Sequence, residues 1–405
     1  MWRNNAVLMI VLFLPAILPV PAAWSEEQGR DFIAEARLIF ISVACGDGQV
    51  RGGIDAAIVE SHCREVKPAI SRARKNFVNK AQPFLVALLP ADLPTEVVYP
   101  FGGGDLLTAL ATYRDATVIT TISLESAGDP RRLARANASE LRKALKAFRA
   151  SELYLLDMHD NKTENLPPFE QGIIPGQVAF SLLAAAVHGY EPVSLRYFRV
   201  DDDGSLHYFT EEEIAGLEHV KSRKLVPFMP DPDFSPAFRN MELTLRRTGN
   251  GRGRELIIHR HIAANLGNRR FADSPLKKHL EGKGRISAMT KAGGYLLWRD
   301  DFSVLRGYLL QHMAFMISDS TGILPHHAAP AGFEQATYGS FHGAFLDSEG
   351  GDNAAELRRL WSAQPYRPLP FRYGYSDTRG ANHLLVTRPK KAGKQESSVL
   401  FPAVK

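Results

Sequence analysis

A strand, a glycine-rich turn, a helix and a second strand follow one another over residues 96–125, and this succession constrains the fold most. Residues 96–101 are rich in β-branched and aromatic side chains, and three glycines come directly after them. Residues 105–113 have helical spacing, and residues 117–124 form a second β-type run. Because strands joined through a helix pair in parallel, the segment predicts an α/β layer with a partly parallel sheet.

The residues before this unit are expected to be helical, and many of those after it to form antiparallel strands. Helical spacing covers most of residues 28–91 and recurs over residues 132–150 and 174–187. Two pairs of β-type runs enclose glycine-containing turns, a pattern typical of hairpins. The later predicted elements are the hairpins 193–200 with 205–210 and 241–247 with 255–261, a helix over 302–313, a strand over 314–317 and a strand pair of 369–375 with 382–387. Together the patterns predict a Rossmann-like, partly parallel sheet with an antiparallel extension and a helical N-terminal region.

These patterns divide the chain into four parts. They are a signal peptide (residues 1–25), a helical N-terminal region (26–92), an α/β domain with the antiparallel extension (93–389) and a disordered tail (390–405). Neither a repeat nor a long linker separates the second part from the third. One domain and two domains therefore both remain open.

The first 25 residues have the layout of a secretory signal peptide. Arg3 precedes an uncharged, almost wholly apolar run over residues 6–18, and small residues follow it. The alternative is an uncleaved anchor, but a spanning helix needs about 20 apolar residues and this run is shorter. Cleavage is expected after Ala22, Ala23 or Ser25. The mature protein is then periplasmic or secreted, without stable membrane insertion.

Export decides how the two cysteines are interpreted. Cys45 and Cys63 are the only cysteines, and an oxidising compartment favours a disulfide between them. The alternative is a pair of thiols that serve as catalysts or metal ligands. Because they lack the spacing of a Cys-x-x-Cys motif, the disulfide is the expected state.

The glycine turn is the first candidate ligand-binding site. Gly102, Gly103 and Gly104 would let a ligand approach the backbone, and Glu125 closes the next strand 20 residues after Asp105. This spacing resembles Rossmann-type folds, including methyltransferase-like ones, in which an acid after the second strand holds a ribose hydroxyl. The alternative is a tight turn in which Asp105 caps a helix and no ligand binds.

Two later segments also combine reactive side chains. Lys291 and Tyr295 are four residues apart and are candidates for proton transfer. Asp319, Ser320 and Thr321 follow a short apolar strand, a usual place for sites in open α/β sheets, although the same residue types also form turns. Lys291, Tyr295 and Asp319 are thus the catalytic candidates, and Ser320 and Thr321 join the ligand-binding set.

Other constellations point to no specific chemistry. His259 and His261 should lie on one side of a strand, but further zinc ligands are not identifiable, so no metal site is predicted. The same holds for the group Asp157, His159 and Asp160 and for the pair His326 and His327. The residues Gly339, Ser340, His342 and Gly343 only approximate a nucleophile elbow, because the first glycine is one residue too close to the serine.

Composition excludes further classes of protein. The chain has 405 residues, 45% of them apolar, so most of it can bury a core. Lys+Arg is 49 and Asp+Glu is 44, which gives a net charge of +5 without a basic stripe. A nucleic-acid-binding protein is therefore not expected.

Several segments in order resemble a family of exported bacterial proteins with a YPFxGxD-type turn after a strand. They are residues 98–107, 122–125, 291–297, 318–325, 338–339, 369–375 and 382–385. The chain departs from the pattern at Gly103 and Gly104, where a bulkier polar-Gly-Pro turn is typical. The family has no assigned activity. The resemblance therefore implies one continuous architecture and an envelope location, and it transfers no catalytic role or cofactor.

Three hypotheses follow, and whether the protein is an enzyme stays open. The first is an exported enzyme or binder whose small polar ligand lies at the strand ends near the glycine turn. The second is a non-catalytic envelope protein on a degenerate Rossmann-like scaffold, with aromatic residues of 226–238 as candidates for contact with an envelope partner. An active methyltransferase is the third, and it requires retention in the cytoplasm. Fold alone assigns no reaction and no cofactor.

Overall fold

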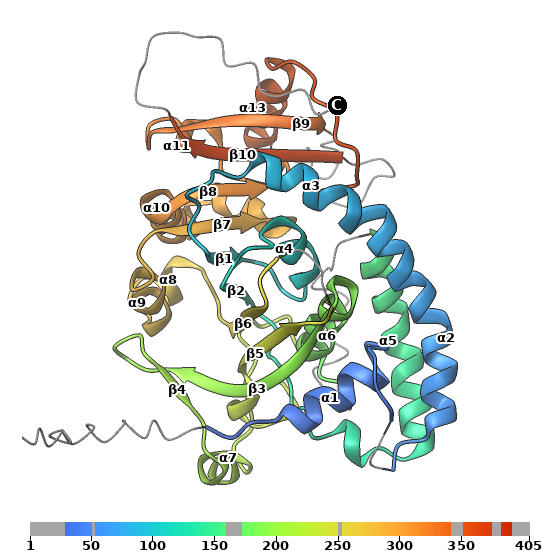
Figure 1. Ribbon diagram of the computed structural model, residues 1–405. Helices are drawn as coiled ribbons and strands as arrows, with labels where there is room; N and C mark the ends of the chain where they lie inside the picture. The colour runs from blue at the N-terminus through green and yellow to red at the C-terminus, as the bar shows by residue number, and fades with distance from the viewer. Residues whose placement is uncertain are drawn as a thin grey trace, which may run out of the picture.

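Ten strands form one mixed sheet that runs through the middle of the molecule (Figure 1). The computed structural model describes residues 29–50, 53–158, 172–249, 253–341, 351–374 and 382–390. The expected signal peptide lies outside these residues, as does the expected tail except for Lys390. The strands are β1 Glu96–Pro100, β2 Val118–Ser123, β3 Tyr190–Val200, β4 Leu206–Tyr208, β5 Asn240–Arg247, β6 Leu256–Ala263, β7 Ile286–Thr290, β8 Met313–Ser318, β9 Phe333–Ser340 and β10 Asn382–Pro389.

The strand order across the sheet is β4-β3-β5-β6-β2-β1-β7-β8-β10-β9. The five adjacent strands β6, β2, β1, β7 and β8 are parallel to one another, and all other pairs in the sheet are antiparallel. Numbered in chain order, the parallel strands run 3-2-1-4-5, which is the order of a doubly wound sheet. The structure thus confirms the predicted α/β class with a Rossmann-like, partly parallel sheet and an antiparallel extension.

Helices cover both faces of the sheet, as parallel strands require. Figure 1 shows α1, α2, α5 and α6 on one side and α8, α9 and α10 on the other. The helices are α1 Ile33–Ser42, α2 Ala56–Ala73, α3 Asn79–Leu88, α4 Leu106–Thr112, α5 Ala138–Met158, α6 Gly176–His188, α7 Glu211–Leu217, α8 Asn268–Phe271, α9 Pro275–Glu281, α10 Ser303–His312, α11 Pro325–Ala328 and α13 Asp352–Ser362. None of the helices in the described ranges is both long and apolar enough to cross a membrane.

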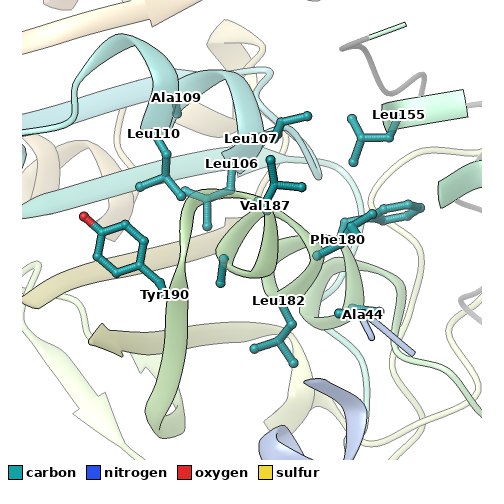
Figure 2. Packing of buried hydrophobic residues seen from close by; sticks show 14 of the residues in the cluster. Ala44, Leu106, Leu107, Ala109, Leu110, Leu155, Phe180, Leu182, Val187 and Tyr190 are labelled. Carbon is teal, nitrogen blue, oxygen red and sulfur yellow. The ribbon is translucent and has the colours of Figure 1, made fainter. Parts of the chain in front are cut away.

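The larger buried cluster joins the N-terminal helices to one face of the sheet. In Figure 2, Leu106 and Leu107 of α4 lie beside Val187 of α6, in a region of fully buried aliphatic and aromatic side chains. Phe148 of α5 and Phe180 of α6 stack within the same cluster, with ring centroids 4.7 Å apart. Their burial removes large apolar surfaces from water and fixes α4, which begins at the end of β1.

One predicted strand pair is wrong in its first member. Residues 369–374 form no strand, and Tyr375 lies outside the described residues. Pro370 interrupts this segment and lacks an amide donor, and one backbone hydrogen bond, from His383 N–H to Tyr373 O at 3.0 Å, ties the segment to β10. β10 pairs instead with β8 and with β9, the outermost strand on this side. The outer edge of β9 is covered by side chains of Gln364 and Arg367.

The expected disulfide is present. Cys45 and Cys63 are joined by an S–S bond of 2.03 Å, which links the residues after α1 to the middle of α2. A closed loop of this size restricts the unfolded chain by about 3 kcal/mol in the chain-entropy model.

Replacement of both cysteines by alanine should therefore lower the free energy of unfolding by about 3 kcal/mol. Chemical denaturation of the double variant measures this loss directly. A denaturation midpoint equal to that of the oxidised protein would contradict the expectation.

Candidate functional site

The candidate residues follow the carboxyl ends of four neighbouring strands. β2, β1, β7 and β8 lie side by side and parallel, so their ends share one edge of the sheet. Gly102 to Asp105 follow β1, Glu125 follows β2, Lys291 follows β7, and Asp319 to Thr321 follow β8. β2, the next strand along the chain, pairs with β1 on one side, and β7 pairs with β1 on the other side. This is the switch point at which open α/β sheets bind ligands.

A buried ion pair joins the ends of β1 and β7. Lys291 Nζ lies 3.2 Å from Asp105 Oδ2, and both side chains are almost fully buried. The same carboxylate oxygen accepts a hydrogen bond from the Tyr99 hydroxyl at 3.0 Å. Thr108 donates its backbone N–H and its hydroxyl to Asp105 Oδ1, so Asp105 is the N-cap of α4. The capping interpretation of Asp105 is therefore confirmed, and Lys291 neutralises the buried cap.

A second carboxylate ties β7 to β8. Asp319 accepts hydrogen bonds at Oδ1 from the Thr321 N–H at 2.8 Å and the Thr321 hydroxyl at 2.5 Å. Its Oδ2 accepts the N–H of Ala292 at 3.0 Å. Burial raises the pKa of Asp319, and the three hydrogen bonds oppose this rise. Asp319 thus positions the loops after both strands.

The backbone is strained at the same place. Phe101 after β1 has a φ of 61° and Ala292 after β7 has a φ of 57°. These values cost non-glycine residues about 1–3 kcal/mol each and occur often at functional sites. Gly103, with a φ of 45°, takes the same conformation without that penalty. The strained residues therefore flank the strand pair at which the strand order reverses.

Among the described residues at this edge, four buried Ser and Thr hydroxyl groups have no hydrogen-bond partner. They belong to Ser123, Thr290, Ser318 and Ser320. The first three residues end β2, β7 and β8, and Ser320 follows Asp319. Buried hydroxyl groups normally bind protein or water, because desolvation without a partner costs free energy. The strand ends therefore hold buried hydroxyl groups whose hydrogen-bonding capacity is unused in this structure.

Two glycines keep space for these hydroxyl groups. A Cβ atom at Gly294 would lie 2.9 Å from Thr290 Oγ1, and one at Gly322 would lie 2.1 Å from Ser318 Oγ. A side chain at either position would displace the hydroxyl or the backbone. The loops after β7 and β8 thus pack tightly over the strand ends.

A pair of buried histidines lies behind Glu125. Thr121 Oγ1 lies 2.9 Å from His259 Nε2 and 3.2 Å from His261 Nδ1, and His261 Nε2 donates to Glu125 O at 2.7 Å. Because His261 Nε2 carries the proton, its Nδ1 accepts from the Thr121 hydroxyl, whose oxygen then accepts from His259 Nε2. Burial lowers the pKa of His259 to about 3 and that of His261 to about 4. Both are neutral and lie on the same side of β6, as their spacing predicts.

Several residues of this edge were missed by the sequence analysis. Tyr99 and Thr108 contact Asp105, His383 Nδ1 accepts the Ser320 N–H at 3.0 Å, and the Tyr373 ring centroid lies 6.0 Å from Lys291 Nζ. The hydroxyl residues do have a sequence signal, because β2, β7 and β8 each end in Ser or Thr after a run of largely apolar or β-branched residues.

The remaining candidates lie elsewhere. Asp157 is exposed near the end of α5, 3.8 Å from Arg72, whereas His159 and Asp160 fall outside the described residues. His326 Nδ1 lies 2.6 Å from Glu356 Oε2 at the surface. The Tyr295 ring packs near Trp298, with centroids 6.5 Å apart, while the Lys291 amine is directed to Asp105. Gly339 and Ser340 belong to β9, and His342 and Gly343 lie outside the described residues.

No protein-family model matches this chain, and no curated protein matches it.

Proposed function

We propose that this is an exported, periplasmic or secreted protein that binds or acts on a small polar ligand at the carboxyl edge of β2, β1, β7 and β8. The unpartnered hydroxyl groups at the ends of β2, β7 and β8 carry the proposal, because several of them gather at one edge of the sheet and buried hydroxyl groups normally have a hydrogen-bond partner. The Lys291–Asp105 pair and the strained Phe101 and Ala292 lie at the same edge. A bound ligand would offset the free-energy cost of the buried ion pair and of the strained backbone.

The strand order also supports a methyltransferase-like scaffold. Without the inserted strands β3 to β5, the sheet runs 3-2-1-4-5-7-6 in chain order, and its seventh strand, β10, is antiparallel to both neighbours. Methyltransferase-like sheets share this arrangement. The residues fit S-adenosylmethionine poorly, because Glu125 is only 2% exposed and the Gly102 N–H is bonded to Ile122 O at 3.1 Å. A repurposed cleft on this scaffold is the better account.

Export rests on the N-terminal pattern and is supported by the disulfide. Disulfides persist mainly in oxidising compartments, and a Cys45–Cys63 bond is compatible with such a location. Nucleotide coenzymes are scarce outside the cytoplasm. The ligand is therefore expected among metabolites or wall components of the envelope.

A thermal-shift screen of the mature protein tests the proposal. The panel contains divalent metal salts, sugars, peptidoglycan fragments, nucleotides and S-adenosylmethionine. One class should raise the melting temperature of the wild type, since a ligand at 100 times its dissociation constant stabilises by about 2.7 kcal/mol. In the Ser320→Ala variant that shift should fall, because the ligand loses a hydrogen bond to the Ser320 hydroxyl.

Ser222→Ala is the matched control. Ser222 is also buried and its hydroxyl is also without a partner, but it lies outside the candidate site. Its removal should leave the ligand-induced shift unchanged. If no class shifts the wild type, or if both serine variants lose the shift equally, the proposed ligand site is wrong.

The second candidate is a non-catalytic envelope protein that acts through surface contacts. Phe228, within residues 226–238, is 75% exposed, so one aromatic side chain of this segment is accessible to a partner. The same screen separates the two functions, because this candidate predicts no shift with any small molecule.

A further inference from the structure

The disulfide lies beside a cavity that opens to the surface. The cavity has a volume of about 440 Å³, and Cys63 lines it together with Glu60, Arg64 and Lys67. Cys63 is 9% exposed and Cys45 is 4% exposed. A small thiol in this cavity would therefore meet the Cys63 sulfur, with Cys45 as the leaving group. The cavity lies on the N-terminal helices and is separate from the strand-end site.

A buried histidine lies close to the two sulfur atoms, and a buried glutamate lies next to the histidine. One ring nitrogen of His62 and the two Sγ atoms all lie within 4.8 Å of one another. His62 Nε2 lies 2.9 Å from Val43 O and 3.3 Å from Glu152 Oε2. Because a carbonyl oxygen can only accept, Nε2 carries the proton, and Nδ1 keeps a bare lone pair that has no partner.

The cost of this arrangement has no explanation in a purely structural disulfide. His62 and Glu152 are 2% and 0% exposed, and both Glu152 oxygen atoms lack hydrogen bonds. Such groups destabilise the fold. Cys45 adds strain, because it is a non-glycine residue with a φ of 54°. The same cluster is useful once a thiol is present, since a bare imidazole nitrogen is the usual base for one.

We propose that the Cys45–Cys63 bond is an exchangeable disulfide that oxidises small, preferably anionic, thiols entering through this cavity. The incoming thiol gives its proton to His62 Nδ1, and its sulfur attacks Cys63 Sγ. The Cys45–Cys63 bond breaks, and Cys45 Sγ takes the electron pair and then the proton from His62. A second thiol attacks the incoming sulfur and releases Cys63 as a thiol. The net change is two thiols oxidised to one disulfide while Cys45 and Cys63 are reduced.

The two sulfur atoms lie near backbone carbonyl oxygens. Cys45 Sγ lies 3.6 Å from Val43 O, and Cys63 Sγ lies 3.9 Å from Ile41 O, and these oxygen atoms are weak acceptors for thiols once the bond is reduced and the sulfur atoms have moved apart. Arg64 and Lys67 outnumber the single acid Glu60 in the cavity lining, which favours an anionic thiol. The cavity therefore favours the approach of an anionic thiol to the Cys63 sulfur.

The rate of reduction under native conditions tests the proposal. Full-length mature protein is mixed with dithiothreitol, quenched with an alkylating agent and analysed by mass spectrometry. The rate should rise linearly with thiol concentration. In His62→Gln it should fall at least about tenfold, the lower range of general-base effects. A merely structural His62 predicts the opposite, because a destabilised variant opens more often and is reduced faster. A rate independent of thiol concentration, or an unchanged or faster His62→Gln variant, overturns the proposal.

The charge preference has a test that does not perturb the core. Arg64 and Lys67 are exposed, so Arg64→Gln with Lys67→Gln should fold normally. This variant should react more slowly with 2-mercaptoethanesulfonate while its rate with neutral 2-mercaptoethanol stays the same. The exposed pair Lys75→Gln with Lys80→Gln, which does not line the cavity, is the matched control. An equal rate ratio for the two thiols in all three proteins would contradict the anionic preference.

Discussion

Lowering the pH from 7 to 5 is expected to remove about 4 kcal/mol from the free energy of unfolding through His259 and His261 alone. Burial lowers the pKa of these side chains to about 3 and about 4, whereas in the unfolded chain both return to about 6.5. A depressed folded pKa stabilises the fold above pH 6.5, and this stability is lost as the pH falls toward the folded pKa. Each histidine contributes about 2 kcal/mol over these two pH units.

Urea denaturation at a series of pH values measures this effect. The slope of stability against pH near pH 5 should correspond to about two protons taken up on unfolding by this pair. In His259→Gln that uptake should be lower by about one proton. His219→Asn, at an exposed position, is the control and should leave it unchanged. If His259→Gln unfolds with the same proton uptake as the wild type, His259 is not buried in its neutral form.

Replacement of Lys291 by methionine should lower the free energy of unfolding by about 3–5 kcal/mol. Methionine fills much of the same volume but leaves the Asp105 carboxylate buried beside the Tyr99 hydroxyl without a cation. Removal of one member of a buried pair costs this much because the remaining charge keeps its desolvation penalty. Denaturation at pH 7 measures the loss.

The chain contains a matched pair at the opposite end of the same strands. Lys283 precedes β7 and lies 2.8 Å from Glu96 at the start of β1, but the Glu96 side chain is 36% exposed. Lys283→Met should cost much less, because water can solvate Glu96. Asp105→Asn combined with Lys291→Met should recover a large part of the loss. Equal losses for Lys291→Met and Lys283→Met would show that Asp105 is not effectively desolvated.

The parallel core was predictable because its signals are local. β1 and β2 consist largely of apolar or β-branched residues, and a glycine turn and a short helix connect them. β7 and β9 were missed. The sequence of β9, Phe-Glu-Gln-Ala-Thr-Tyr-Gly-Ser, mixes polar residues with a glycine because the strand lies at the sheet edge and needs no continuous apolar surface.

The candidate residues were predictable, but most of their partners were not. Asp105, Lys291 and Asp319 each follow a parallel strand. The alternation of strands and helices along the chain therefore implies that they lie on one edge of the sheet. Sequence spacing pairs Lys291 with Tyr295, whereas the Lys291 amine is directed to Asp105, 186 positions away in the chain. That contact depends on β7 being placed next to β1, and no local pattern encodes the order of strands across a sheet.

The covered outer edge of β9 has a consequence for assembly. Gln364 accepts the N–H of Thr337 and donates to Gln335 O, Arg367 O accepts the N–H of Gly339, and the Arg367 guanidinium donates to Thr337 O. At the other margin, β4 has only three residues. Among the residues that the structure describes, neither margin therefore offers a long row of unbonded amides to a second molecule. We expect concentrated solutions to resist the strand-to-strand growth that leads to fibrils.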